Sequence, residues 1–177
     1  MQSVQSPIIP VVGELIRQNP GTISLGQGVV YYNPPQESFE KIPEFLATPD
    51  NHKYKAVEGI PQLHEAIAAK LKTDNNIGIN SKNCIVVTAG SNMGFTNALL
   101  AITSAGDEVI IQAPYYFNHE MAAIMANCRP VIVDTDANYQ LNIDAIKKAI
   151  TDKTRAIVTV SQQPNWRRLS FRSTPGS

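Results

Sequence analysis

Residues 108–134, EVIIQAPYYFNHEMAAIMANCRPVIVD, decide the fold that the sequence predicts. The segment begins with the apolar run 108–112 and ends with a second run, 130–134, and both runs are short and rich in Val and Ile. The stretch between them predicts a helix over residues 116–127. A strand, a helix and a second strand in this order are typical of a right-handed crossover between two parallel strands.

The same alternation continues on both sides of this segment. Apolar runs predict two further strands, over residues 84–88 and 155–160. Three further helices are predicted over residues 60–74, 92–104 and 142–150. The first of these is amphipathic, because Leu63, Ile67 and Leu71 are four residues apart. Apolar, β-branched strands separated by helices indicate an α/β fold with a parallel-type sheet that helices cover on both faces.

The first 59 residues are rich in proline and irregular. Ser6 as a cap and Pro7 at the first helical position predict a short helix within residues 6–19. A second helix is predicted over residues 36–47, and an extended stretch lies between the two. This segment does not build a compact core by itself.

Composition restricts the class of protein. The chain has 177 residues, of which 43% are hydrophobic and 17% charged, so it fits one domain with a core. Lys plus Arg number 15, as do Asp plus Glu, and this balance gives no case for a nucleic-acid or membrane partner. No apolar run approaches the ~20 residues of a membrane span and no leader is visible, so we expect a cytoplasmic protein. Cys84 and Cys128 are predicted to be free buried thiols.

The loops at the carboxyl ends of parallel strands are where ligands bind in such sheets. The loop after the strand 84–88 contains Gly90, which lets the backbone approach a ligand closely, followed by Ser91 and Asn92 at the start of a helix. The amides at a helix start suit a phosphate. The alternative is an ordinary tight turn with a helix cap.

The loop after the strand 108–112 carries the aromatic cluster Tyr115, Tyr116 and Phe117. An aromatic face at this position could stack on a planar ring, and the alternative is core packing against the following helix. The sequence has no P-loop motif and no complete G-x-G-x-x-G motif. Its three histidines, His52, His64 and His119, have no metal-ligand spacing with the cysteines, so no metal site is predicted.

Several stretches taken together resemble the class I/II (fold-type I) pyridoxal-phosphate-dependent aminotransferases. They are LGQG at 25–28, KYKAVEGIPQLHEAIAAKL at 53–71, VTAGSNMGFTNALLAI at 87–102, GDEVIIQAPYYFNHEM at 106–121 and KTRAIVTVS at 153–161. The resemblance covers about residues 7–161 and is nearest to the branch that contains aspartate, aromatic and kynurenine-type aminotransferases. It implies an incomplete large domain of that fold and pyridoxal 5'-phosphate as the cofactor.

The resemblance assigns roles to residues in these loops. Gly90, Ser91 and Asn92 would hold the cofactor phosphate, and Tyr116 would stack on the pyridine ring. Tyr54 would reach the cofactor phosphate of a neighbouring subunit, which implies a homodimer with shared sites. The substrates implied are an amino acid and a 2-oxo acid.

Two features depart from the family pattern. Gly28 would offer its backbone N–H to the substrate carboxylate, but Val29 and Val30 follow it where family members often carry Phe-Pro or Glu-Pro. The lysine that forms the Schiff base with the cofactor is absent, because it lies downstream of the last predicted strand in this family. The lysines near that strand do not match its motif, so no catalytic residue is assigned and the chain itself is predicted to be inactive.

The resemblance divides the chain into three parts. Residues 1–59 would be an N-terminal segment that belongs to the small domain or dimer arm. Residues 60–161 would be a partial PLP-binding large domain, and residues 162–177 would be a tail without pattern.

The codons of the tail indicate how it arose. The family continues after the strand 155–160 with a motif close to P-N-N-P-T-G. One permissible coding of Gln162 to Ser170 reads N-N-P-T-G-V-V-Y when the frame shifts by one nucleotide, and Trp166 followed by any arginine codon forces the glycine. We therefore expect residues 162–177 to be out-of-frame translation, so that the chain is an N-terminal fragment.

Three interpretations of function follow. The first is a PLP-dependent aminotransferase that transfers an amino group from an amino acid to a 2-oxo acid, with another fold-type I PLP enzyme such as a carbon–sulfur lyase as the alternative chemistry. The second is a non-catalytic truncated fragment. The third is a nucleotide-binding Rossmann domain, against which the incomplete glycine motif argues.

Overall fold

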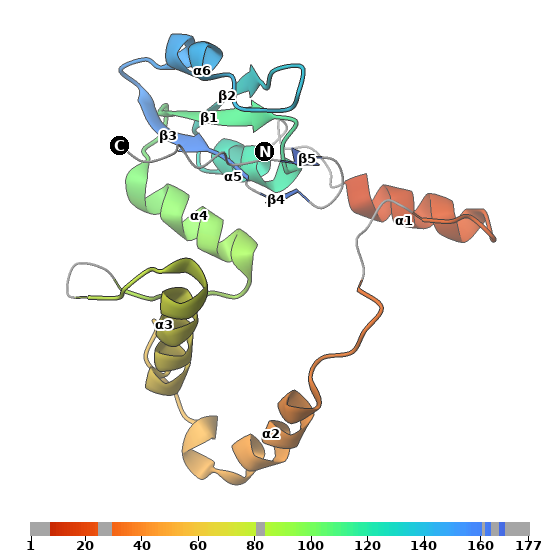
Figure 1. The fold of residues 1–177 in the computed structure, drawn as a ribbon, viewed down its shortest axis with the longest axis vertical. Coiled ribbons are helices and arrows are strands. Elements are labelled where there is room, and N and C mark those ends of the chain that lie inside the picture. The colour runs from red at the N-terminus through yellow and green to blue at the C-terminus, as the bar shows by residue number, and fades with distance from the viewer. Residues whose placement is uncertain (1–7, 25–29, 81–83, 161, 164–166, 169–177) are drawn as a thin grey trace. The chain divides into compact units, whose positions relative to one another are not determined.

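The structure is a computed structural model that describes residues 8–24, 30–80, 84–160, 162–163 and 167–168. The chain divides into two compact units, and Figure 1 labels their helices and strands. One, which we call the helical unit, is Val30–Gly94, and the other, the sheet unit, combines Met1–Val29 with Phe95–Ser177. The division falls inside the helix α4 (Ser91–Ile102).

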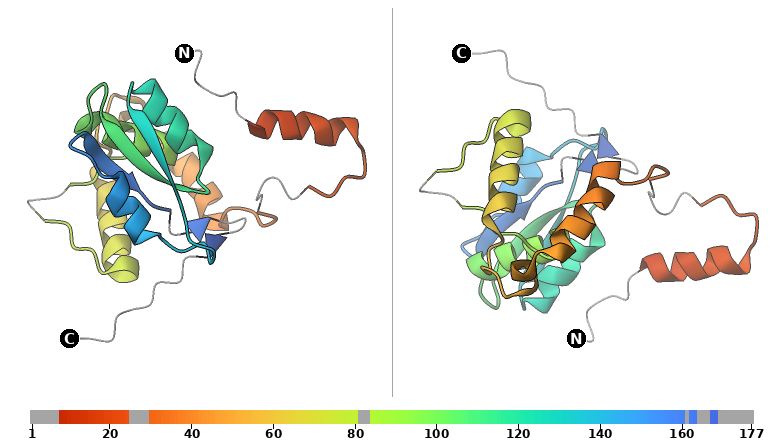
Figure 2. Two further views of the ribbon diagram at one scale, coloured as in Figure 1. Left: turned by 90° about the horizontal axis from the view of Figure 1, so that it is seen from above. Right: turned by 90° about the horizontal axis from the view of Figure 1, so that it is seen from below.

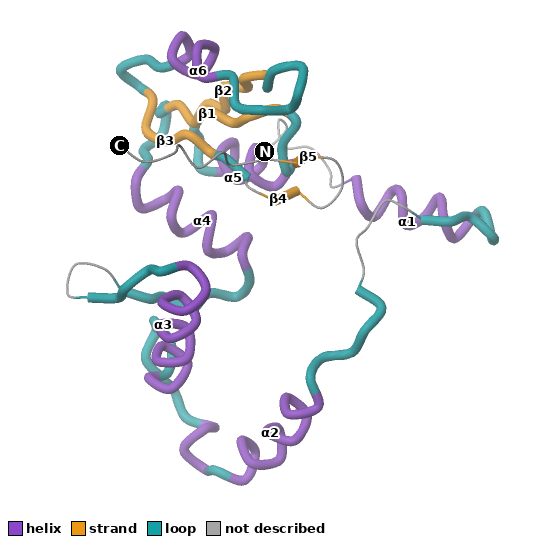
Figure 3. The backbone as a smooth tube through the Cα atoms, viewed as in Figure 1, coloured by secondary structure: helices purple, strands orange, loops and turns teal. Residues whose placement is uncertain are grey.

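Three parallel strands form the sheet of the sheet unit (Figures 2 and 3). They are β1 (Glu108–Ala113), β2 (Arg129–Asp134) and β3 (Thr154–Val158), and their order in the sheet is β2-β1-β3. In the central strand β1, Ile110 lies opposite Val131 of β2 and Ile157 of β3. The predicted parallel pairing of these three segments is therefore confirmed, with small shifts of the strand boundaries.

Helices cover both faces of this sheet, as the strand pattern predicted. They are α4, α5 (Phe117–Met125) and α6 (Ile143–Ala149). Val109 and Ile111 of β1 are fully buried on the face that α4 and α5 cover, while Ile110 is fully buried on the other face against Ile146 of α6. Successive strand residues point to opposite faces. Figure 1 shows α5 and α6 on opposite sides of the strands.

Gln112, near the end of β1, is a buried polar residue. It is 1% exposed, and neither polar atom of its side-chain amide has a hydrogen-bond partner among the described residues. Burying an unpaired amide costs about 1–3 kcal/mol in proteins. We expect Gln112→Met, which keeps the side-chain length without the amide, to raise the free energy of unfolding by about 1–2 kcal/mol.

Chemical denaturation of the sheet unit measures this difference. The matched control is Gln18→Met, because Gln18 is exposed and its replacement removes no buried polar group. A loss of stability in Gln112→Met would mean that the buried amide has a hydrogen-bond partner.

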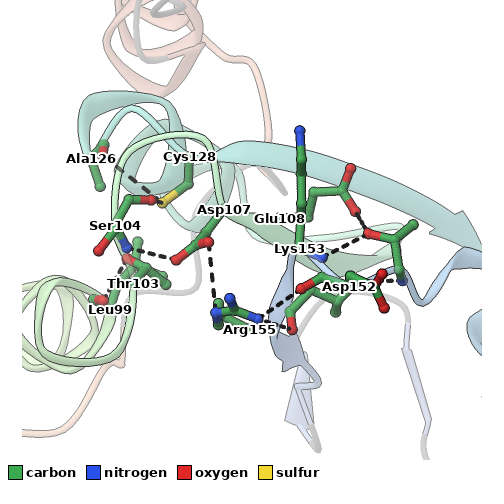
Figure 4. Close-up of polar contacts among 12 residues, drawn as sticks. Leu99, Thr103, Ser104, Asp107, Glu108, Ala126, Cys128, Asp152, Lys153 and Arg155 are labelled. Carbon is green, nitrogen blue, oxygen red and sulfur yellow. Dashed lines mark hydrogen bonds and ion pairs between the residues drawn. The ribbon is translucent and has the colours of Figure 1, made fainter.

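A network of hydrogen bonds and ion pairs lies at the amino end of the sheet (Figure 4). The Glu108 carboxylate, in a residue only 4% exposed, accepts hydrogen bonds from Arg129 Nη1 at 3.0 Å and from Thr151 Oγ1 at 2.6 Å. The neighbouring Asp107 pairs with Arg155 Nε at 3.6 Å. These contacts connect β1 to the start of β2 and to the turn that leads into β3.

The helical unit consists of α2 (Gln36–Ala47), the short 3-10 helix η1 (Pro49–His52) and α3 (Pro61–Asn75). The bounds of α2 agree with the prediction, and α3 confirms the helix predicted over 60–74. The apolar stripe of α3 is only partly covered, since Leu63 is 41% exposed and no residue of α3 is buried. The side chains of Asn51 and His52 join η1 to carbonyls in the last turn of α2.

The strand predicted over residues 84–88 is wrong. These residues form no strand, and Val87 donates its backbone N–H to the Glu58 carbonyl at 2.7 Å instead. A strand requires a neighbouring strand to pair its backbone groups, and no described segment pairs with 84–88 in this way. The prediction of a buried thiol at Cys84 is also wrong, because the residue is exposed and lines an apolar hollow of about 570 Å³. Cys128 is buried and free, as predicted.

The remaining elements lie near the two ends of the chain. The helix α1 (Ile8–Gln18) confirms the helix predicted within 6–19, while its predicted cap Ser6 and first residue Pro7 lie outside the described residues. β4 (Gln162–Gln163) and β5 (Arg167–Arg168) form a short antiparallel pair. Among the described residues, no helix is both long and apolar enough to cross a membrane.

Candidate functional site

Tyr116 lies at the carboxyl end of the central strand, where α/β sheets bind ligands. The strand β1 ends at Ala113, and Tyr116 is the N-cap residue of α5, with an extended backbone at φ −78° and ψ 115°. The residue is 36% exposed. The short connection between β1 and α5 therefore holds this aromatic ring at the surface of the sheet unit.

Three neighbours contact the side chain of Tyr116. Asn118 donates a hydrogen bond from Nδ2 to the Tyr116 hydroxyl oxygen at 2.6 Å. The ring of His119 meets the ring of Tyr116 edge-on, with centroids 5.4 Å apart and planes at 87°, and the ring of Phe117 lies 5.2 Å away at 61°. Edge-to-face contacts at these distances are the favoured geometry of aromatic pairs.

His119 is held between the sheet unit's core and Tyr116. Its ring lies 4.2 Å from that of Phe95 in α4, with the two planes inclined by only 31°. His119 lines an apolar groove of about 370 Å³ together with Phe95, Ile102 and Val158, and its Nδ1 is buried with no hydrogen-bond partner among the described residues. This burial lowers the pKa of the His119 imidazole below its ordinary value of 6.5.

The lowered pKa of His119 predicts a pH dependence of stability. In the unfolded chain this imidazole takes up a proton near pH 6.5, whereas the folded state resists protonation to a lower pH. The unfolded state therefore binds more protons below pH 6.5, and the contribution of His119 to stability is lost as the pH falls. We expect urea denaturation at pH 7 and pH 5.5 to show a smaller pH effect in His119→Phe than in the natural sequence. An equal pH effect in both proteins would contradict the prediction.

Tyr115 and Tyr116 have different environments, although they are adjacent. Tyr115 packs against the core of the sheet unit and donates its hydroxyl to the Glu120 carboxylate at 2.7 Å. That hydrogen bond, followed by burial and the charge of Glu120, raises the pKa of the Tyr115 hydroxyl above its ordinary value. Core packing, the alternative considered for the aromatic cluster, thus describes Tyr115, whereas Tyr116 remains accessible at the surface.

The loop Ala89 to Asn92 forms the start of α4. Gly90 has a φ of +87°, a left-handed backbone that favours glycine, and its N–H bonds the Thr88 carbonyl at 2.8 Å. A Cβ placed on Gly90 would have nothing within 4 Å, so the space beside its backbone is open. Ser91 is the first residue of α4 and Asn92 the second. The loop therefore presents a helix N-terminus beside open space, which suits an anion.

The other predicted site residues are dispersed. Tyr54 follows η1 in the helical unit and is fully exposed. Gly28 lies outside the described residues. Gly90 to Asn92 lie together in the helical unit and Tyr116 belongs to the sheet unit, so their common site stays a prediction.

The neighbours that contact Tyr116 were not predicted from the sequence. Asn118 and His119 follow it directly, and a polar pair at the start of a helix beside an exposed aromatic residue was the available signal. The described residues contain no group of three or more His, Cys, Asp or Glu side chains that could hold a metal ion.

Comparison with known proteins identifies the family. The model of the aminotransferase class I and II family matches residues 20–163, which include both loops described above. The chain belongs to this family. In this member of the class I and II aminotransferase family, Tyr116 lies between β1 and α5 at the carboxyl end of the central strand.

Curated relatives are identical to this chain at between a third and two fifths of the aligned positions. The aromatic aminotransferase ISS1 of Arabidopsis thaliana is 34% identical over 163 residues, which are 90% of this chain and 41% of that protein. The aspartate aminotransferase of Pyrococcus abyssi is 38% identical over 138 residues, 77% of this chain and 35% of that protein. This aminotransferase chain thus spans about two fifths of the length of these relatives.

Solved structures agree with the family. The aromatic aminotransferase of Pyrococcus horikoshii is 38% identical with a TM-score of 0.69, covering 77% of this chain and 37% of that one. The methionine aminotransferase YbdL of Escherichia coli, at 23% identity, has a TM-score of 0.82 and covers 96% of this chain and 45% of that one, which supports the fold.

Proposed function

We propose that the protein is a pyridoxal-phosphate-dependent aminotransferase that transfers an amino group from an amino acid to a 2-oxo acid. The observation that carries this proposal is the family match over residues 20–163, since it contains both Gly90 to Asn92 and Tyr116. The relatives named above are aromatic and aspartate aminotransferases. Their names support an amino acid as the donor substrate.

We propose that residues of two loops hold different parts of the cofactor. Gly90, Ser91 and Asn92 would hold its phosphate, because the backbone of Gly90 borders open space and α4 begins at Ser91. Tyr116 would bind the pyridine ring through its partly exposed aromatic face. When bound, the cofactor supplies an electron sink for the substrate carbon.

Binding of pyridoxamine 5'-phosphate tests these two contacts. This compound has no aldehyde and cannot label surface lysines, so a titration followed by calorimetry reports non-covalent binding. We expect Gly90→Val to weaken binding at least tenfold, because the side chain fills the open space and strains the backbone. Tyr116→Leu should weaken it about threefold to tenfold through the lost ring contact.

The control for these variants is Tyr31→Leu, since Tyr31 is 99% exposed and lies in neither loop. Unchanged affinity in both Gly90→Val and Tyr116→Leu would contradict the proposed cofactor site.

We further propose that this chain alone lacks the lysine that binds the cofactor covalently and therefore does not transaminate. The purified chain is mixed with pyridoxal phosphate, an amino acid and 2-oxoglutarate, and reduced with borohydride. We expect no turnover and no selectively labelled lysine. Turnover together with one labelled lysine would overturn this proposal.

In the longer protein we propose a homodimer in which Tyr54 reaches the cofactor phosphate of the neighbouring subunit. The full exposure of Tyr54 supports this role. The test is a longer form of the protein that carries Tyr54→Phe. Its affinity for pyridoxamine 5'-phosphate should fall while the dimer, measured by sedimentation, persists.

We also propose that residues 1–59 are an N-terminal segment and that residues 60–161 are a partial cofactor-binding domain. Residues 162–177 are, in this proposal, out-of-frame translation. The N-N-P-T-G reading of the shifted codons supports the last point. Sequencing the coding DNA from about codon 150 onward tests it. Codons that do not yield this motif in a shifted frame would contradict it.

A further inference from the structure

We propose that His119 and Asn118 are positioning residues that hold the ring of Tyr116 as a fixed platform for a planar ligand ring. The inference rests on the proposed cofactor role of Tyr116 and extends it to two residues that need not touch the ligand. It is carried by the contacts around the Tyr116 side chain, all of which lie within the sheet unit.

The hydroxyl end of Tyr116 is fixed by Asn118. The 2.6 Å hydrogen bond from Asn118 Nδ2 spans only two positions of the chain, so both groups sit on the first turn of α5. A hydrogen bond at the end of the ring opposes swinging of the side chain about its Cα–Cβ bond. Asn118 is half-buried, and its hydrogen bond to Tyr116 is made at the surface of the sheet unit.

The plane of the Tyr116 ring is fixed by His119. The two rings are almost perpendicular, at 87°, which places an edge of one against the face of the other. The backbone N–H of His119 also bonds the Tyr116 carbonyl at 3.0 Å. The backbone hydrogen bond and the ring contact therefore both fix the orientation of the Tyr116 ring relative to the His119 ring.

Phe95 prevents His119 from moving away. The rings of Phe95 and His119 lie 4.2 Å apart with their planes tilted by 31°, and Phe95 packs against the buried core cluster around Leu99 and Ile111. Phe95, His119 and Tyr116 thus form a continuous series of ring contacts from the core to the surface. A ring held in this way loses little conformational freedom when a ligand stacks on it, and this preorganisation favours binding.

The test begins with the unliganded chain, where no cofactor is required. Nuclear magnetic resonance of the aromatic carbons reports the ring-current shift and ring-flip rate of Tyr116, and Tyr115 serves as the internal control. We expect His119→Ala to shift the Tyr116 signals and speed its ring flips, and His119→Phe, which keeps an aromatic ring, to restore both. Asn118→Ala should also shift the Tyr116 signals, because the hydroxyl end of the ring is no longer held, and leave the Tyr115 signals unchanged.

A second measurement is the affinity for pyridoxamine 5'-phosphate. We expect His119→Ala to weaken binding about threefold to tenfold and His119→Phe to stay within about twofold of the natural sequence. Unchanged Tyr116 signals in both His119→Ala and Asn118→Ala would overturn the platform. Absence of binding by the natural chain would instead contradict the proposed cofactor site, while the resonance data would still decide whether the ring is fixed.

Discussion

Replacing Ile110 by Ala is expected to lower the free energy of unfolding of the sheet unit by about 3–4 kcal/mol. Ile110 is fully buried at the centre of β1, where it packs with Val133 of β2 and Ile146 of α6. The substitution removes buried methyl and methylene groups from a small core and leaves a cavity between the sheet and α6. Urea denaturation followed by circular dichroism measures the loss.

The matched control for Ile110→Ala is Ile157→Ala. Ile157 lies directly opposite Ile110 in the register of the sheet, but it is on the edge strand β3 and 45% exposed. Its truncation should cost less than about 1 kcal/mol, because much of the side chain already contacts water. Similar losses in the two variants would mean that the face of β3 is covered in solution.

Replacing Glu108 by Ala is expected to lower the free energy of unfolding by about 2–3 kcal/mol. The buried carboxylate accepts a 2.6 Å hydrogen bond from Thr151, and hydrogen bonds to charged groups contribute more than neutral ones. The Arg129 side chain is 72% exposed, so its ion pair with Glu108 adds little. Most of the loss should therefore come from the contact with Thr151.

A double-mutant cycle separates these contributions. Thr151→Val in the natural background removes the hydroxyl, and the same change in Glu108→Ala should cost much less, because its partner is already gone. Glu14→Ala is the control for an exposed ion pair, since Glu14 and Arg17 are both more than half exposed, and its effect should be within about 0.5 kcal/mol. Additive effects of the Glu108 and Thr151 changes would contradict the proposed contribution of their hydrogen bond.

The sheet could be predicted from the sequence because its signals are local. The strand, helix and strand of residues 108–134 follow each other without interruption, and β1 is apolar over most of its length because helices cover both its faces. The segment 84–88 has the same apolar pattern but no paired neighbour among the described residues. The residue types of a segment indicate whether it can form a strand. Whether it does so depends on a second segment, elsewhere in the chain, that pairs with its backbone.

The candidate site was only partly predictable for the same reason. Tyr116 and Gly90 were predicted as site residues because they follow apolar runs and are residue types with a clear use at such positions. The contact between Phe95 and His119 joins two helices separated by a strand, and no sequence spacing indicates it. The unpaired amide of Gln112 could not be predicted either. A glutamine in an apolar run does not show whether another group forms a hydrogen bond with its side chain.

The order of the strands in the sheet has a consequence for how the protein is made. The central strand β1 and its neighbour β2 are separated only by α5, whereas β3 follows later, after α6. The ribosome releases the chain from its N-terminal end, and nearby segments meet at low entropic cost. We therefore expect β1, α5 and β2 to pair on the nascent chain while β3 is still being synthesised. The second edge of β1 would then stay unpaired until residues 154–158 emerge, so that β3 joins last of the three described strands.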